Sequence, residues 1–205
     1  MLVTLLAIGL ALTGVLASCG GDGAPEAVHE TPAGTAAPLT GAAKAMQSLN
    51  SYTFEGDVAA DAFKFHIAGT FNAPNRLSET ITPEGAGATK IVVIGDRSYQ
   101  LNPGSSKWTA GPAPSGGPAT DPRAAFGALS QAELLSPATA DRYAFRVTGQ
   151  VASSLILGSA EVRGTATVQG GRIVTLAYAS EKPAVSVDLI YAALNTAPVV
   201  TPPPT

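Results

Sequence analysis

The chain has 205 residues, of which 13% are charged and 6% aromatic, and its formal net charge is −3. This length suffices for one domain with a sizeable core. The small net charge excludes the strongly basic surface of a nucleic-acid-binding protein, and a single cysteine, Cys19, excludes a disulfide-stapled scaffold.

The N-terminal stretch ends in a short motif. Residues 1–16 carry no charged side chain, and Leu16-Ala17-Ser18-Cys19 follows. The run falls short of the roughly 20 apolar residues of a transmembrane helix but has the length of a signal-peptide core. The motif resembles a bacterial lipobox, which implies a signal peptide over residues 1–18, removed before a Cys19 that carries diacylglycerol and palmitate. A signal peptide normally opens with Lys or Arg, whereas the first basic residue here is Lys44. An ordinary secretory signal and an N-terminal anchor helix therefore stay open as alternatives.

Residues 19–39 are rich in Gly, Pro and Ala and predict a flexible tether between the membrane and a domain. Its acids Asp22, Glu26 and Glu30 explain the net charge, because 12 acidic and 12 basic residues remain elsewhere. This balance shows no Lys/Arg cluster for an anionic membrane surface. We therefore expect the acyl chains of Cys19 to hold the protein at the membrane.

The domain is expected over residues 40–200, opening with a helix over 40–49 capped by Thr40. Alternating apolar residues then predict antiparallel strands, clearest where Phe63, Phe65 and Ile67 alternate with Lys64 and His66. The strands expected in this half cover residues 52–59, 63–71, 76–82, 90–94 and 97–101.

The second half opens with a helix over residues 122–129, capped by Asp121 and extended in one interpretation over 130–135. Gly170-Gly171 predicts a tight hairpin turn. The strands expected here cover residues 143–151, 162–168, 172–179 and 184–194, and a disordered tail is expected over 201–205. Runs of strands with helices between them predict an α+β fold, an antiparallel sheet with helices on one side.

No catalytic or metal-binding constellation is visible. His29 lies in the tether, and His66 has no cysteine or second histidine beside it, whereas a zinc site needs three or four converging ligands. The close acids Glu55 and Asp57 are consistent with a solvated hairpin end. Trp108 and Tyr99 fit either a binding platform or core packing. We expect no enzyme activity, no metal and no cofactor.

The segments AAKAMQSLNSYTFEGDV, IGDRSYQLNPGSSKW, GTATVQGGRIVTLAYA and VDLIYAALNTAPVVTPP together resemble the LppX/LprAFG lipoproteins of mycobacteria and, more distantly, the LolA/LolB lipoprotein carriers. The resemblance covers about residues 42–203 and carries no catalytic signature. It implies a half-barrel, a curved antiparallel sheet with helices on its concave side and an apolar cavity between them. The family carries or presents lipids and glycolipids at the cell envelope.

This resemblance implies a lipid or glycolipid ligand, a membrane reached through the acyl anchor, no nucleic acid and a monomer on the outer face of the bacterial cytoplasmic membrane. Small residues at Gly149, Gly164, Ala166, Thr175 and Ala177 could leave room for the ligand. An envelope structural or protein-interaction lipoprotein with a solid core is the alternative. The candidate lining residues are Phe63, Phe65, Ile67, Phe71, Phe126, Leu129, Phe145 and Val147.

Overall fold

The computed structural model describes residues 37–61, 63–114, 122–139 and 141–204, and for residues 37 and 136–139 it describes the backbone only. These residues belong to one compact unit, Pro32–Thr205. The predicted signal peptide, Cys19, the tether up to residue 36, and Asp121 lie outside the described residues.

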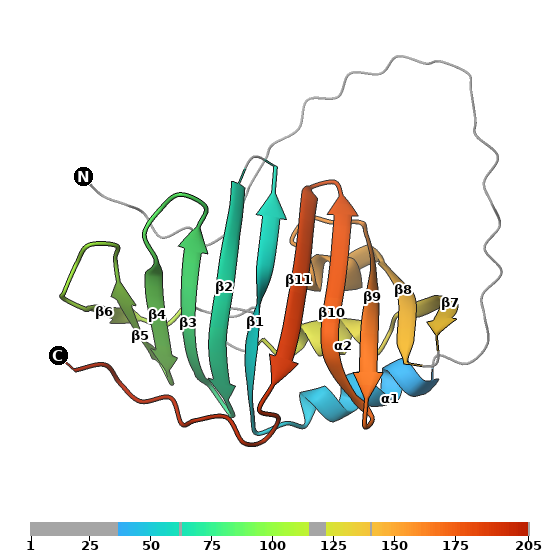
Figure 1. The fold of residues 1–205 in the computed structure, drawn as a ribbon, viewed down its shortest axis with the longest axis horizontal. Helices are drawn as coiled ribbons and strands as arrows, with labels where there is room; N and C mark the ends of the chain where they lie inside the picture. Colours follow the sequence, from blue (N-terminus) through green and yellow to red (C-terminus); the bar gives the residue numbers. More distant parts are fainter. Residues whose placement is uncertain (1–36, 62, 115–121, 140, 205) are drawn as a thin grey trace, which may run out of the picture. The chain divides into compact units, whose positions relative to one another are not determined.

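One antiparallel sheet of eleven strands dominates the unit, in the order β6-β5-β4-β3-β2-β1-β11-β10-β9-β8-β7 (Figure 1). The first half supplies β1 (Ser51–Ala60), β2 (Phe63–Asn72), β3 (Arg76–Pro83), β4 (Thr89–Ile94), β5 (Arg97–Leu101) and β6 (Thr109–Pro112). The second half supplies β7 (Glu133–Thr139), β8 (Arg142–Thr148), β9 (Glu161–Gln169), β10 (Arg172–Glu181) and β11 (Ala184–Ala192). Pairing of β1 with β11 joins the two halves.

The predicted Gly170-Gly171 hairpin turn is confirmed between β9 and β10. Both glycines have positive φ angles, +56° and +73°. Two consecutive left-handed residues form the turn whose twist matches that of antiparallel strands, and glycine adopts this backbone without steric cost. The turn aligns Arg172 with Gln169 and thereby sets the register of the pair.

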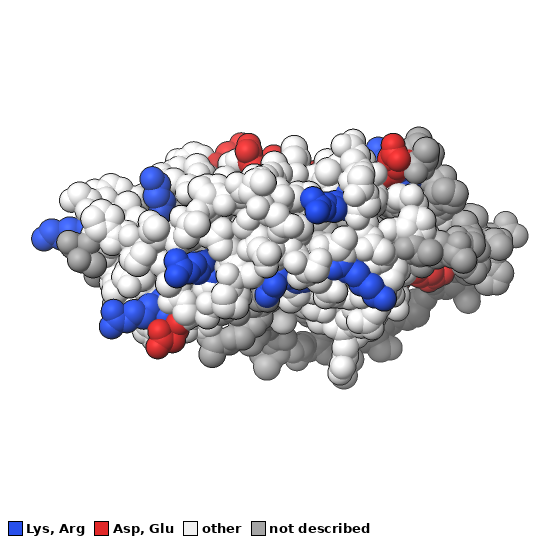
Figure 2. Space-filling view, turned by 90° about the horizontal axis from the view of Figure 1, so that it is seen from below, with Lys and Arg blue, Asp and Glu red and all other residues white. Residues whose placement is uncertain are grey.

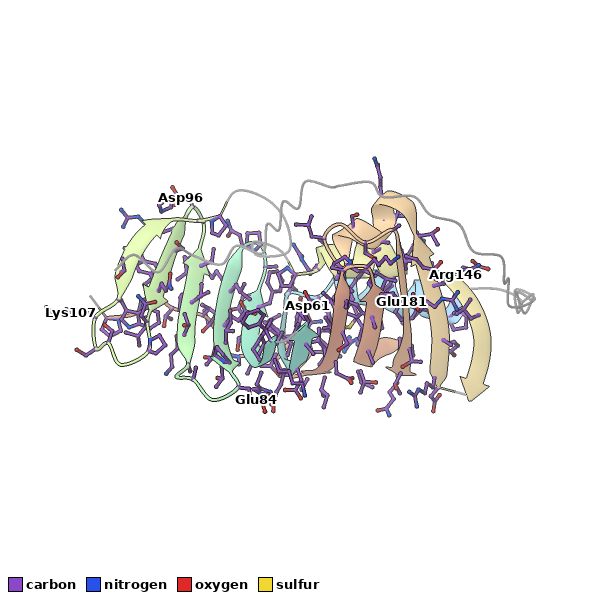
Figure 3. The ribbon with its side chains drawn as sticks, turned by 90° about the horizontal axis from the view of Figure 1, so that it is seen from above. Asp61, Glu84, Asp96, Lys107, Arg146 and Glu181 are labelled. Atoms are coloured by element: carbon purple, nitrogen blue, oxygen red, sulfur yellow. The ribbon has the colours of Figure 1, made fainter. Side chains whose placement is uncertain are left out.

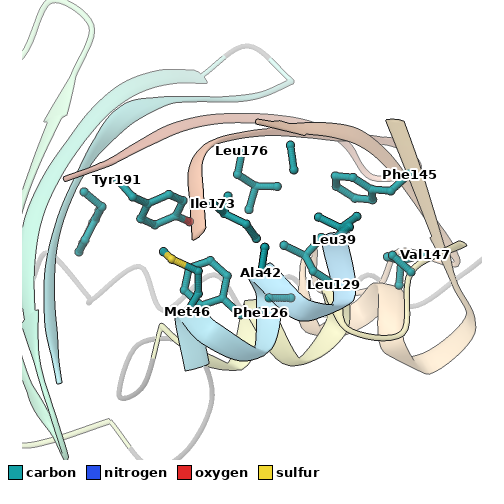
Figure 4. Packing of buried hydrophobic residues seen from close by; sticks show 14 of the residues in the cluster. Leu39, Ala42, Met46, Phe126, Leu129, Phe145, Val147, Ile173, Leu176 and Tyr191 are labelled. Carbon is teal, nitrogen blue, oxygen red and sulfur yellow. The ribbon is translucent and has the colours of Figure 1, made fainter. Parts of the chain in front are cut away.

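Two α-helices, α1 (Ala37–Gln47) and α2 (Ala124–Leu129), pack on the same face of the sheet (Figure 4). The helix α1 contacts β9, β10 and α2, and α2 also contacts a 3-10 helix, η1 (Gly149–Ser154). We call this face the inner face and the opposite one the outer face. The sheet is curved in Figure 4, so the predicted curved antiparallel sheet is confirmed. Its edges β6 and β7 lie at opposite ends of the strand order.

The core lies between the helices and the inner face. Tyr52, Phe71, Phe126 and Tyr191 form an aromatic group in which the Tyr52–Phe71 and Phe126–Tyr191 ring centroids are each 5.3 Å apart. Burying a large apolar side chain contributes about 1.5–3 kcal/mol. The helices add small and aliphatic contacts to this group, from Leu39, Ala42, Ala43, Met46 and Leu129.

The structure corrects three local predictions. The first helix begins at Ala37, ahead of the predicted Thr40. The extension of the second helix over residues 130–135 is wrong, because Leu134 lies in edge strand β7 opposite Phe145 of β8. Arg146 fixes this pairing by donating to Glu133 Oε2 over 2.7 Å. The strand expected to continue to residue 151 ends at Thr148, since Gly149 turns the chain with a φ of +66°.

The C-terminal segment packs on the outer face. The side-chain amide of Asn72 donates to the Pro198 carbonyl over 3.1 Å, and its oxygen accepts from the Val200 N–H over 2.7 Å. Val200 is thereby buried in a second cluster with Val92 and Tyr99, against which Trp108 packs. The structure therefore supports the packing interpretation of Trp108 and Tyr99.

Candidate functional site

The inner face differs between its two halves. Over β8–β10 the helices cover it, since Phe145, Val162, Ala166 and Leu176 are all fully buried. Figure 4 shows Leu176 and Phe145 on the sheet above Leu39 and Leu129 of the helical layer. This half forms a continuous part of the core.

Over β1–β4, away from the strands that α1 contacts, alternate residues form a half-buried apolar strip. The register aligns Ile67 with Gly56 and Ile81. The adjacent rows contribute Val58 opposite Phe65, and Ile91 opposite Glu79. We call this set the apolar strip: Val58, Phe65, Ile67, Ile81 and Ile91.

Glu79 is the ionisable residue within this strip. It lies on the inner face between Gly69 of β2 and Ile91 of β4, with Leu77 and Ile81 as its inner-face neighbours along β3. Burial raises the pKa of Glu79, because desolvation penalises the charged carboxylate. Within the described residues no side chain or backbone N–H donates to it at hydrogen-bonding distance. The Glu79 carboxylate is thus a hydrogen-bond acceptor that lies among apolar side chains on the inner face.

An open groove of about 650 Å³ adjoins the strip at the edge where β1 meets β2. Val58, Phe65 and Val187 form its apolar wall, and Val58 and Phe65 belong to the apolar strip as well. Figure 3 views the unit from this edge, where Asp61 and Glu84 lie. Its polar lining comes from Asp57, Lys64, His66, Glu84 and Asp188.

The outer side of the groove carries a histidine between two carboxylates. His66 Nδ1 lies 2.9 Å from Asp57 Oδ1, and Nε2 lies 3.7 Å from Glu55 Oε1. Asp57 aligns directly with Asp188 of β11 and with His66 of β2. Asp57 thus has a like charge opposite it on β11 and the imidazole of His66 opposite it on β2. In the described part of the chain, no group of three or more His, Cys, Asp or Glu residues could hold a metal ion.

The eight candidate lining residues fall into three environments. Phe71, Phe126, Leu129, Phe145 and Val147 lie in the buried cluster. Phe65 and Ile67 are brought together in the apolar strip. Phe63, with 74% of its side chain exposed, lies at the start of β2 and joins neither. That the set lines a cavity stays a prediction.

The small residues that were expected to leave room for a ligand lie in other surroundings. A Cβ atom at Gly164 would lie 2.7 Å from the Phe145 ring, so this ring already fills the space. Thr175 and Ala177 point to the outer face, since Leu176 between them points inward, and Thr175 donates to Thr167 Oγ1 over 2.7 Å. Gly149 lies in η1.

Sequence reasoning missed Glu79 and its neighbours Ile81 and Ile91. The alternation of Leu77, Glu79 and Ile81 could have indicated that Glu79 lies on the apolar face, because residues two apart in a strand share a face. A carboxylate between two apolar residues on the same face of β3 distinguishes this part of the sheet from its neighbours.

None of the described helices is long and apolar enough to cross a membrane.

The comparisons with known proteins bear on the fold. No protein-family model and no curated protein sequence matches the chain.

Among solved structures, the crystal structure of LprF from Mycobacterium bovis superposes with a TM-score of 0.58 and 16% sequence identity, over 82% of this chain and 95% of that chain. Two others match more loosely. A LolA superfamily protein from Nitrosomonas europaea has a TM-score of 0.32 at 11% identity, over 80% of this chain and 94% of that chain. A DUF1329 family protein from Desulfovibrio piger has a TM-score of 0.36 at 8% identity, over 80% and 92%. The LprF match confirms that this chain has the fold of the LppX/LprAFG lipoproteins.

Proposed function

We propose that this protein is a lipid-anchored carrier that binds the acyl chains of a lipid or glycolipid and has no enzymatic activity. In this proposal the sheet is a half-barrel with α1 and α2 on its concave side. The ligand lies along the apolar strip and reaches solvent at the adjoining groove. The LprF-like fold and the predicted lipobox at Cys19 support the envelope location of this activity, on the outer face of the cytoplasmic membrane.

The observation that carries the proposal is the contrast between the two halves of the inner face. Over β8–β10 the helices cover Phe145, Val162 and Leu176, which are fully buried. The apolar strip over β1–β4 stays half-buried, as does the neighbouring Val187 of β11. Partly exposed apolar side chains that are contiguous across a sheet mark binding surfaces. Covering them with an acyl chain would recover about 25 cal/mol for each Å² of apolar area removed from water.

The polar surroundings of the strip fit an amphiphile. An acyl chain along Ile67 and Ile81 passes Glu79, whose carboxylate can accept a hydrogen bond from a lipid hydroxyl or ammonium group. A free fatty-acid carboxylate would meet repulsion there once Glu79 ionises. We therefore expect a ligand with donor groups, as in glycolipids.

The test is binding of a fluorescent acyl-chain probe by the chain from residue 20 onward, together with mass spectrometry of co-purified lipid. Ile67→Trp and Ile81→Trp should fill the strip and weaken probe binding about tenfold. Ile190→Trp is the matched control, because Ile190 is 60% exposed on the outer face of β11 and leaves the strip unchanged. A folded chain without bound lipid that takes up no probe would refute the proposal.

The alternative is an envelope lipoprotein that binds a protein partner and has a solid core. The complete burial of Phe71, Phe126 and Phe145 favours it. Cross-linking of the anchored protein in intact cells separates the alternatives. A lipid carrier retains probe binding in pure form, whereas an interaction protein is captured with one partner and takes up no probe.

A further inference from the structure

Arginine recurs at one position of the sheet. In an antiparallel sheet alternate strands begin at the same edge, and here β1, β3, β5, β8 and β10 begin at one edge. Apart from β1, each of these strands starts with arginine: Arg76, Arg97, Arg142 and Arg172. We call this edge the arginine edge. No strand that begins at the opposite edge starts with a basic residue.

The four side chains also share a face. The residue after each arginine points to the inner face: Leu77, Ser98, Tyr143 and Ile173. Successive residues of a strand point to opposite faces. All four guanidinium groups therefore project from the outer face at the same edge, and Figure 2 shows Lys and Arg side chains spread across this end of the molecule.

These guanidinium groups are not neutralised by carboxylates. Elsewhere in the sheet Arg146 pairs with Glu133 and Arg163 pairs with Glu161. Within the described residues none of the four edge arginines forms an ion pair. Arg76 donates to the Val200 carbonyl over 3.0 Å, and Arg142 donates to the Thr165 hydroxyl over 3.3 Å. Both groups are thus positioned while their charge stays available.

The described surroundings of the four arginines add one cation and two acids at this edge, which leaves it net positive. Figure 1 shows α1, which packs on β10 and β9 and carries the exposed Lys44, at the end where β10 begins. Asp96 and Asp141, in the turns before β5 and β8, are the acids described there. The turns of the opposite edge carry Asp61 and Glu84, and β10 ends there in Glu181.

The distance between the edge arginines favours an extended anionic surface as their partner over a single phosphate group. The edge arginines lie on β5, β3, β10 and β8, which span eight strand spacings, or about 40 Å at roughly 4.8 Å per strand. The strand ends form a rim, and beside β1–β3 the C-terminal segment lies along it and accepts from Arg76 (Figure 1). The arginines are thus spread along an extended edge and not gathered at one point. Each Lys or Arg near an anionic bilayer contributes about 1 kcal/mol.

We propose that the arginine edge docks the domain on a bilayer containing anionic phospholipids, with the strands upright on the membrane. The predicted anchor at Cys19 makes a bilayer the nearest anionic surface, which favours it over a soluble polyanion. Docking would add to the acyl anchor and hold the groove, at the opposite edge, away from the bilayer. This inference concerns the orientation of the domain and does not depend on which ligand the apolar strip binds.

The test is co-sedimentation of the chain from residue 20 onward with phosphatidylglycerol-containing vesicles and with phosphatidylcholine vesicles. This chain contains the whole compact unit with its own core. It should bind the vesicles that contain phosphatidylglycerol and not the phosphatidylcholine vesicles. Binding should fall as salt is added, because salt screens exposed charges. The double variant Arg97→Gln/Arg172→Gln should bind about 30-fold more weakly, at roughly 1 kcal/mol for each charge lost.

The matched control is Lys107→Gln/Lys182→Gln, which removes the same charge from exposed residues at the opposite edge, outside the groove lining. It should bind like the unaltered chain, and thermal unfolding should show that both variants fold. Equal losses in the two variants, or no preference for anionic vesicles, would overturn the proposal. Binding to heparin without binding to vesicles would assign the edge to a soluble polyanion and would overturn it as well.

Discussion

Glu79 of β3 lies directly opposite Gly69 of β2 on the inner face of the sheet. A Cβ atom at Gly69 would collide with the Phe54 ring, so this ring occupies the space that a side chain would fill. The half-buried Glu79 side chain therefore lies between an aromatic ring and Ile91, with no described donor. A carboxylate that is partly removed from water without a donor reduces stability.

The first prediction concerns the pH dependence caused by Glu79. Its pKa is raised in the folded state, so the folded protein holds this proton more tightly than the unfolded chain. Stability should therefore fall as the pH rises from 4.5, the ordinary value, through the raised pKa. Glu79→Leu should stabilise the protein by about 1–3 kcal/mol at pH 7, and the gain should shrink as the pH falls.

Chemical unfolding at several pH values measures this gain. Glu84→Leu is the control, since Glu84 lies exposed in the loop after β3 and should show no pH-dependent gain. A Glu79→Leu variant that is equally or less stable than the parent at pH 7 would mean that a donor reaches the carboxylate in solution.

Glu79 also illustrates which features the sequence could predict. Strands such as 63–71 and 76–82 follow from an alternation of period two, which depends on neighbouring residues only. The depth of a side chain depends on what covers it from elsewhere in the chain. Phe63 and Phe71 share one pattern, yet Phe63 is 74% exposed at a strand start, whereas Phe71 is buried against Tyr52 and the Arg123 guanidinium.

The edge arginines escaped prediction for the same reason. They are separated by tens of residues in the sequence, so no local window contains a basic cluster. Pairing of distant strands brings them to one edge. The same reason explains Leu134. Its local sequence fits a helix, but pairing with the distant Phe145 places it in strand β7.

The second prediction concerns the sealed half of the inner face. Gly164→Ala would place a Cβ atom 2.8 Å from Tyr178 Cβ and 2.7 Å from the Phe145 ring, and against the backbone carbonyl of Ala177, which cannot move aside. Overpacking of this kind costs about 1–3 kcal/mol. Gly111→Ala is the control, since its nearest neighbour would be Ser98 Oγ at 3.8 Å. Thermal unfolding should separate the two variants, and equal melting temperatures would show that β9 has room.

The third prediction concerns the C-terminal segment. Asn72→Ala removes both the donor to the Pro198 carbonyl and the acceptor of the Val200 N–H. Loss of these hydrogen bonds should cost about 1–3 kcal/mol and release Val200 from Val92 and Tyr99. Hydrogen exchange at Val200 should accelerate, whereas Asn75→Ala, an exposed neighbour in the same turn, should leave it unchanged. Unchanged exchange in Asn72→Ala would mean that packing of Val200 suffices.

The last prediction concerns Cys19 and links the anchor to the arginine edge. Cys19→Ser removes the only thiol in the chain, so incorporation of a labelled fatty acid should be lost completely. The variant should either lose its signal peptide and be released or stay unprocessed. The fraction from which residues 1–18 are removed should leave the membrane at high salt. At low salt a remainder should stay bound, because edge arginines such as Arg97 and Arg172 retain their attraction to anionic lipid. Adding Arg97→Gln/Arg172→Gln to Cys19→Ser should abolish this salt-sensitive remainder. Persistent acyl labelling of Cys19→Ser would refute the lipobox, whereas a remainder insensitive to the arginine substitutions would refute docking through this edge.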